Sequence, residues 1–114
     1  MSIAELFKTK NTVYSFEIFP PKKTSSVDTI YSTLDQLKGL KPDFISVTYG
    51  AGGSVANCLT CEIASIVKNK YGIRPLAHLT CVNSTRQDVA EILRQLKESG
   101  IQNIMALRGD INPD

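Results

Sequence analysis

Four polar residues whose side chains could do chemistry recur along the chain at intervals of about thirty residues. They are Glu17, Thr48, His78 and Arg108, and each closes or follows a short apolar, β-prone segment. One strand, one helix and two short connections together take up roughly thirty residues. The spacing therefore predicts successive βα units, with a polar residue at the point where such units place their chemistry.

Glu17 is the boldest candidate of the four. It lies between Phe16 and Ile18, and we expect this apolar setting to desolvate the carboxyl in part. Desolvation favours the protonated form, which is the form that a general acid needs. The alternative is a strand carboxylate that faces solvent or pairs with His78 or Arg108.

The other charged candidates also have plain structural explanations. His78 follows an apolar pair, and a single histidine in such a setting is more often a hydrogen-bonded core residue than a catalyst. Arg108 and Asp110 flank Gly109 at the end of a predicted strand. Their opposite charges could form an exposed ion pair, which would contribute less than about 1 kcal/mol.

The pattern of apolar and turn-forming residues predicts the elements that position these side chains. Strands are expected at residues 13–19, 44–49, 76–80 and 101–107, and helices at 27–37, 55–67 and 89–96. Two capping boxes, Ser25 with Asp28 and Thr85 with Asp88, mark the starts of two helices. The helices are expected to end at or near three glycines, at positions 39, 72 and 100. The GAGG segment at 50–53 predicts a loop whose backbone can turn sharply or approach a ligand closely.

Strands that are joined by single helices run parallel, because each helix carries the chain back across the sheet through a right-handed crossover. The carboxyl ends of the strands then share one edge, which binds ligands both in open doubly wound sheets and in closed barrels. Two observations favour the barrel. Each predicted helix has a single apolar face, and no GxGxxG follows the first strand.

The composition predicts one globular unit, because 42% of the 114 residues are hydrophobic and 21% are charged. The 13 basic and 11 acidic residues are scattered along the chain, so no charged patch predicts binding to nucleic acid or to a membrane surface. No segment approaches the ~20 apolar residues of a membrane span. The first eleven residues also lack a signal-peptide core, and we therefore expect a cytoplasmic protein.

Cys58, Cys61 and Cys81 make an odd number of cysteines in a chain without secretory features. This pattern favours reduced thiols over a disulfide framework. Cys58 and Cys61 form a CxxC sequence inside a predicted helix, without the second pair that would complete a zinc site. We expect both to serve packing or a partly exposed helix face and predict no metal site; a metal or redox function is the alternative.

Four segments of the chain, in order and at matching spacing, resemble the flavin-dependent methylenetetrahydrofolate reductases. They are FEIFPPK around Glu17, DFISVTYGAGG around Thr48, AHLTC around His78 and ALRGD around Arg108. The resemblance implies a TIM-type barrel of eight βα units that binds FAD. It further implies reduction of methylenetetrahydrofolate to methyltetrahydrofolate by NADH or NADPH, which supplies methyl groups for methionine synthesis.

The resemblance also implies roles for single residues. Glu17 matches the family's general acid, which protonates a pterin nitrogen so that the bridged ring opens to an iminium. Asp110 matches a carboxylate near the flavin's pyrimidine edge and the folate, where negative charge disfavours the anionic reduced flavin. Thr48 matches a residue on the nicotinamide side of the flavin. The family's flavin contacts match Tyr49, Ala51, His78, Arg108, Gly109 and Asp110.

A barrel of this type takes about 250 residues, so residues 1–114 would form a single unit that is about half of one, with four strands and three main helices. We expect a truncated reductase whose open edges and apolar sheet face lead it to self-associate or to need the missing half. The main alternative is a non-catalytic half-barrel that binds flavin weakly or docks a partner chain. A flavin-independent lyase, with Glu17 and His78 as acid and base, is a further alternative.

Overall fold

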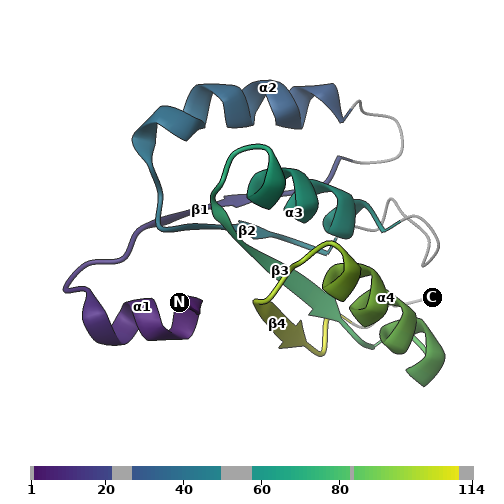
Figure 1. The fold of residues 1–114 in the computed structure, drawn as a ribbon. Coiled ribbons are helices and arrows are strands. Elements are labelled where there is room, and N and C mark those ends of the chain that lie inside the picture. The colour runs from purple at the N-terminus through teal and green to yellow at the C-terminus, as the bar shows by residue number, and fades with distance from the viewer. Residues whose placement is uncertain (1, 22–26, 50–57, 83, 111–114) are drawn as a thin grey trace.

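The computed structural model describes residues 2–21, 27–49, 58–82 and 84–110, and Figure 1 shows the arrangement of their elements. Four strands form one sheet in the order β1-β2-β3-β4, and every neighbouring pair is parallel. The predicted α/β class with parallel βα units is therefore confirmed. In chain order the elements are α1 (Ile3–Thr9), β1 (Ser15–Ile18), α2 (Asp28–Leu37), the 3-10 helix η1 (Lys38–Leu40), β2 (Phe44–Val47), α3 (Leu59–Asn69), β3 (Arg74–Thr80), α4 (Arg86–Glu98) and β4 (Ile104–Leu107).

The main core lies between one face of the sheet and the helices α2, α3 and α4, which cover that face (Figure 1). Each of these helices turns a stripe of apolar side chains toward the strands, as the helical spacing predicts. The largest fully buried side chains of this core are Leu34, Ile45, Val47, Ile63, Val67, Ile92 and Leu96. Burial of this layer fixes which face of every strand points away from the helices.

The structure contains a helix, α1, that the sequence analysis did not predict. It begins at a capping box, in which the Ser2 hydroxyl accepts a hydrogen bond from the Glu5 backbone N–H and the Glu5 carboxylate accepts one from the Ser2 N–H. Ile3 of α1 is buried against Phe44 and Leu76 in a second, smaller cluster. The expected three main helices are thus four among the described residues. Because side chains alternate along a strand, this cluster lies on the sheet face opposite to the main core.

One predicted helix start and two predicted helix ends are confirmed. The Thr85 hydroxyl accepts a hydrogen bond from the Asp88 N–H, and the Asp88 carboxylate accepts one from the Thr85 N–H, so α4 has its predicted capping box. Gly72 and Gly100 follow α3 and α4 with φ of 66° and 77°. Glycine occupies this left-handed region without the steric cost that a side chain would add.

The predicted left-handed stop at Gly39 is wrong, although α2 ends at Leu37 as predicted. Gly39 does not stop the helix; the chain continues through η1, and Lys41 takes the left-handed conformation with φ of 50°. The predicted cap Ser25, the GAGG loop and the predicted helix start at Val55 lie outside the described residues. The four strands form within or close to the predicted ranges, and β3 starts two residues before its range.

The expectation of reduced thiols is also wrong for one pair of cysteines. Cys58 and Cys61 form a disulfide, whereas Cys81 is free. The reason is the start of α3: Cys58 is its N-cap, with an extended backbone, and is not inside the helix as predicted. The two Cα atoms lie 5.2 Å apart, which is within the range that a disulfide can bridge.

Candidate active site

Glu17 and His78 lie on the sheet face that points away from α2, α3 and α4. The register aligns Glu17 with Ser46, and Ser46 with Leu76; His78 follows Leu76 by two residues and therefore shares its face. Glu17 Oε1 lies 3.8 Å from His78 Nε2. This separation is too long for a hydrogen bond, but it brings a carboxylate and an imidazole from β1 and β3 together across β2.

The two side chains differ in exposure. His78 retains 12% of its side-chain exposure and Glu17 retains 50%. The expected partial desolvation of Glu17 is therefore not found in the described structure. The physical reason is that β1 is an edge strand of the described sheet, so half of the Glu17 side chain stays exposed among the described residues.

The imidazole of His78 has a polar atom without a partner. Its Nε2 is buried, and among the described residues no group forms a hydrogen bond with it. Buried polar atoms in folded proteins nearly always have a hydrogen-bond partner, and each exception needs an explanation. A ligand with polar atoms that binds beside Glu17 on this face would satisfy His78, and the ring nitrogens and carbonyls of a flavin are groups of that kind.

Thr48 is held in place through its backbone, directly after β2. Its N–H donates to the carbonyl of Ile18 over 3.1 Å, which continues the ladder between β1 and β2. Its carbonyl accepts a hydrogen bond of 2.8 Å from the Thr60 hydroxyl of α3. Because Val47 aligns with Ala77 on the helix-facing side, the next residue in each strand, Thr48 and His78, belongs to the opposite face.

Tyr49 lies on the other side of the sheet from His78. Its ring is partly buried against the main core, and burial raises the pKa of its hydroxyl, with smaller contributions from Asp88 and Cys81. Its role as a flavin contact stays a prediction. Ala51, the remaining predicted contact in this loop, lies outside the described residues.

The ends of β3 and β4 are joined by backbone hydrogen bonds. The N–H groups of Cys81 and Val82 donate to the carbonyl of Arg108 over 3.2 and 2.8 Å. Gly109 has φ of 86°, and a Cβ added there would lie 2.8 Å from Thr80 Cβ. Contacts that short do not occur between real side chains, so this position requires glycine.

The charged residues beside Gly109 are exposed. The Arg108 guanidinium donates to the carbonyl of Gly109 over 3.2 Å, and within the described part of the chain it forms no ion pair with Asp110. The structure thus brings Glu17 and His78 into proximity and places Thr48 on their face. It places Arg108, Gly109 and Asp110 at the same carboxyl edge of the sheet, without a contact to Glu17.

Two residues that position this site were missed by the sequence analysis. Ser46 is only 7% exposed, and it lies in the row between Glu17 and Leu76. A serine inside an otherwise apolar strand was a readable signal for such a position. Thr60 is 3% exposed and fixes the Thr48 carbonyl, but a threonine in a helix carries no comparable signal.

A hollow of about 290 Å³ lies at the opposite end of the sheet. Its lining includes Lys68 in the last turn of α3, Arg74 at the start of β3 and Asn103 just before β4. The Lys68 ammonium already donates to the carbonyl of Gly100, and Asn103 accepts a hydrogen bond from the Ile3 N–H. The unpartnered polar atom lies at the other end, so we assign the candidate site to the carboxyl edge.

Two searches of the described residues concern other kinds of site. No group of three or more His, Cys, Asp or Glu side chains in that part of the chain could hold a metal ion. None of the helices there is long and apolar enough to cross a membrane.

The fold and the site together define a class of protein. A parallel βα sheet with its polar residues at the carboxyl edge is part of a TIM-type barrel, here with an unclosed sheet. The family model for methylenetetrahydrofolate reductase matches residues 2–114. The chain belongs to this family.

Curated relatives agree with this assignment. The chain is 42% identical over 110 residues to the 5,10-methylenetetrahydrofolate reductase of Pectobacterium carotovorum subsp. carotovorum, covering 96% of this chain and 36% of the relative. It is 39% identical over 99 residues to the enzyme of the same name from Escherichia coli, covering 87% and 33%. A probable methylenetetrahydrofolate reductase (NADH) of Oryza sativa is 42% identical over 99 residues, covering 87% and 16%. The chain thus spans between about a sixth and about a third of the length of these relatives.

Proposed function

We propose that residues 1–114 form the first half of the catalytic barrel of a flavin-dependent methylenetetrahydrofolate reductase. In this proposal, FAD is reduced by NADH or NADPH, and methylenetetrahydrofolate is reduced to methyltetrahydrofolate for methionine synthesis in the cytoplasm. The observation that carries the proposal is the approach of Glu17 Oε1 to within 3.8 Å of His78 Nε2, a buried nitrogen that forms no hydrogen bond among the described residues.

Bound FAD would supply hydride transfer, while the chain's own residues would bind, orient and move protons. His78 is mostly buried and would hydrogen-bond the flavin through its unpartnered Nε2. Thr48, fixed through both of its backbone groups, would border the side on which the nicotinamide docks. Arg108, Gly109, Asp110, Tyr49 and Ala51 are proposed as further flavin contacts.

Glu17 is proposed to protonate a pterin nitrogen of the folate. Its half-exposed carboxyl on an uncovered sheet face leaves room for a substrate to approach. The arrival of flavin and folate beside Glu17 would itself exclude water, which favours a protonated carboxyl. Asp110 is proposed to lie near the pyrimidine edge of the flavin, where its negative charge disfavours an anionic reduced flavin.

This role of Glu17 is tested by separating the two half-reactions in a stopped-flow experiment. In Glu17→Gln, we expect the reduction of bound FAD by NADH or NADPH to be largely unchanged. Oxidation of the reduced flavin by methylenetetrahydrofolate should be abolished, because glutamine cannot give up the proton. Equal losses in both half-reactions would refute the acid role, since they would indicate a general defect of the site.

We also propose that β4 needs a cover, either from the missing half of the barrel or from a second copy of the chain. Three apolar side chains of β4 are between 37% and 40% exposed: Ile104, Met105 and Leu107. Sedimentation of the purified chain tests this. A stable, monodisperse monomer with full reductase activity would contradict the proposal.

A second candidate function is a non-catalytic half-barrel that binds flavin weakly or docks a partner chain. The 50% exposure of Glu17 favours it, because a catalytic acid is commonly more enclosed. Weak flavin binding without folate reduction, with a flavin affinity that is unchanged in Glu17→Gln, would support this candidate over the enzyme.

A further inference from the structure

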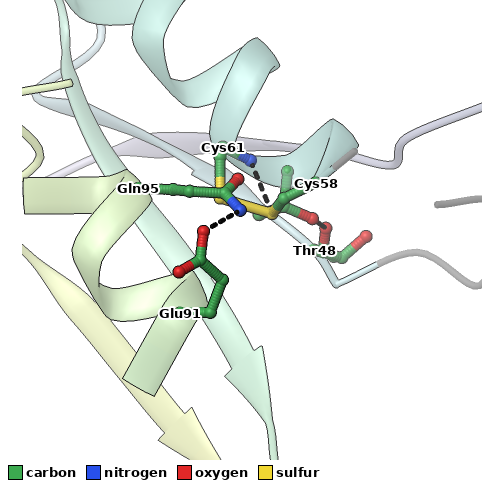
Figure 2. The surroundings of a disulfide bond; sticks show 6 residues. Thr48, Cys58, Cys61, Glu91 and Gln95 are labelled. Atoms are coloured by element: carbon green, nitrogen blue, oxygen red, sulfur yellow. Dashed lines mark hydrogen bonds between the residues drawn. A yellow bond between two sulfur atoms is a disulfide. The ribbon is translucent and has the colours of Figure 1, made fainter. Parts of the chain in front are cut away.

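The disulfide between Cys58 and Cys61 lies at the first turn of α3, close to the candidate site. In the view of Figure 2, the side chains of Glu91 and Gln95 of α4 extend toward the disulfide, and Thr48 is drawn on the side of Cys58. Gln95 donates to the Glu91 carboxylate over 3.2 Å. One side of the disulfide therefore faces the polar side chains of Glu91 and Gln95, where α3 and α4 are in contact.

The two sulfur atoms differ in accessibility. Cys61 is 5% exposed and belongs to the main core, whereas Cys58 is partly exposed. The Cys58 sulfur accepts a hydrogen bond of 3.2 Å from the Cys61 N–H, at the N-terminus of an eleven-residue helix. A helix N-terminus favours a negatively charged sulfur, so the freed Cys58 thiol is the more readily ionised of the two. An incoming thiolate would reach Cys58 more readily than Cys61.

The disulfide is connected to the candidate site through one side chain. Thr60 lies between the two cysteines in the sequence, and its hydroxyl donates to the Thr48 carbonyl over 2.8 Å. Thr60 is 3% exposed, so water does not readily replace this bond. A change in the first turn of α3 would therefore alter the support of Thr48.

We propose that Cys58 and Cys61 form a reversible dithiol–disulfide site, that a dithiol reductant opens it, and that its redox state is transmitted to Thr48 through Thr60. The significance of Thr48 for nicotinamide docking rests on the proposed function, whereas the redox site itself does not. Cys58 is the sulfur that is attacked, and Cys61 is the leaving group.

The exchange is balanced in two steps. A thiolate of the reductant attacks the Cys58 sulfur, so that a mixed disulfide forms and Cys61 leaves as a thiolate, which takes up a proton. The second thiol of the reductant then loses its proton and attacks the reductant's first sulfur, which is bonded to Cys58 in the mixed disulfide. Cys58 is released and takes up a proton to become a thiol. The reductant is oxidised to a disulfide, and the protein gains two electrons and two protons.

Counting thiols tests the redox site without any flavin. The purified chain is equilibrated with mixtures of reduced and oxidised dithiothreitol, then denatured, alkylated and mapped by mass spectrometry. We expect alkylation of Cys81 alone in the oxidised protein and of all three cysteines in the reduced protein, with one reversible transition between them. Cys81→Ser should keep this transition, and Cys58→Ser should abolish it.

Two results of that experiment would overturn the site. One is alkylation of all three cysteines even after oxidation; the other is a disulfide that joins Cys81 of two copies in place of the Cys58–Cys61 bond. Brief alkylation of the folded, reduced chain tests the order of attack. Cys58 should react several-fold faster than Cys61, and equal rates would contradict the assigned roles.

The connection to Thr48 is tested by the backbone amide signal of Thr48 in NMR spectra of the oxidised and reduced chain. We expect this signal to shift between the two states, and Thr60→Val, which lacks the hydroxyl, to remove most of the shift. Thr60→Ser keeps the hydroxyl and should preserve the shift of the Thr48 signal. A Thr48 signal that is the same in both states would overturn the transmission. Failure of flavin binding would leave these readouts unaffected, so the two proposals fail separately.

Discussion

Replacing Gly109 by alanine should destabilise the fold through two separable effects. Gly109 has φ of 86°, and a residue with a side chain in the left-handed region costs roughly 1–2 kcal/mol. The new Cβ would also lie 2.8 Å from Thr80 Cβ and 3.3 Å from Val82 Cγ1. Overpacking of this kind typically costs about 1–3 kcal/mol. Together, Gly109→Ala should lower the free energy of unfolding by about 2–5 kcal/mol.

Two other glycines separate these effects. Gly72 has φ of 66°, but an added Cβ would meet no atom within 4 Å, so Gly72→Ala should cost only the backbone term of roughly 1–2 kcal/mol. At Gly39 an added Cβ also meets nothing within 4 Å, and φ is not in the left-handed region. Gly39→Ala should therefore be neutral or stabilising, by up to about 1 kcal/mol.

The assay is urea denaturation of the three variants and the parent chain, followed by circular dichroism. From the highest to the lowest free energy of unfolding, the expected order of the variants is Gly39→Ala, Gly72→Ala and Gly109→Ala. A Gly109→Ala protein as stable as Gly72→Ala would refute the close approach of β3 and β4 at this edge. That approach positions Arg108 and Asp110, so the same result would weaken the proposed site.

Other predictions concern α4. Ile92 is 1% exposed and Leu93 is 40% exposed, so Ile92→Ala should lower the unfolding free energy by about 2–5 kcal/mol and Leu93→Ala by well under half of that; equal effects in urea titrations would contradict the assigned helix face. Hydrogen bonds from Arg94, then from Gln95, lower the pKa of the Glu91 carboxyl from 4.5 to about 2. Because the folded pKa is depressed, this contribution to stability is complete above about pH 4.5 and is lost as the pH falls toward 2. Unfolding measured across this range should depend less steeply on pH in Glu91→Gln, and identical slopes would refute the interaction.

Local signals predicted the parts of the fold that depend on neighbours in sequence. The Thr85 capping box and the glycines at 72 and 100 were readable because each reports a backbone requirement within one turn. The capping box of Ser2 and Glu5 is a signal of the same kind, although the helix α1 that it begins has only seven residues. At the end of α2, Lys41 rather than Gly39 adopts the left-handed conformation, because the extra turn η1 moves the stop by two residues.

The exposure of Glu17 and the sheet face on which Tyr49 lies depend on contacts across the sheet, which local signals do not report. The exposure of Glu17 is set by what covers β1 and not by Phe16 and Ile18, whose side chains point to the opposite face. The same alternation takes Tyr49 to the core side, away from His78. The shared carboxyl edge of Glu17 and His78 was predictable, since parallel strands end on the same side of a sheet. Their shared face follows from the register of β1, β2 and β3.

The central claim is that the edge bearing Glu17 and His78 is half of a flavin site, and FAD titration of the purified chain tests it most directly. Quenching of flavin fluorescence and a shift of the visible flavin bands should report saturable binding. His78→Ala, which removes the unpartnered Nε2, should weaken this binding, whereas Arg74→Ala at the opposite end of β3 should not. An equal loss of FAD affinity in both variants would contradict the claim, and so would an FAD affinity that is unchanged in His78→Ala.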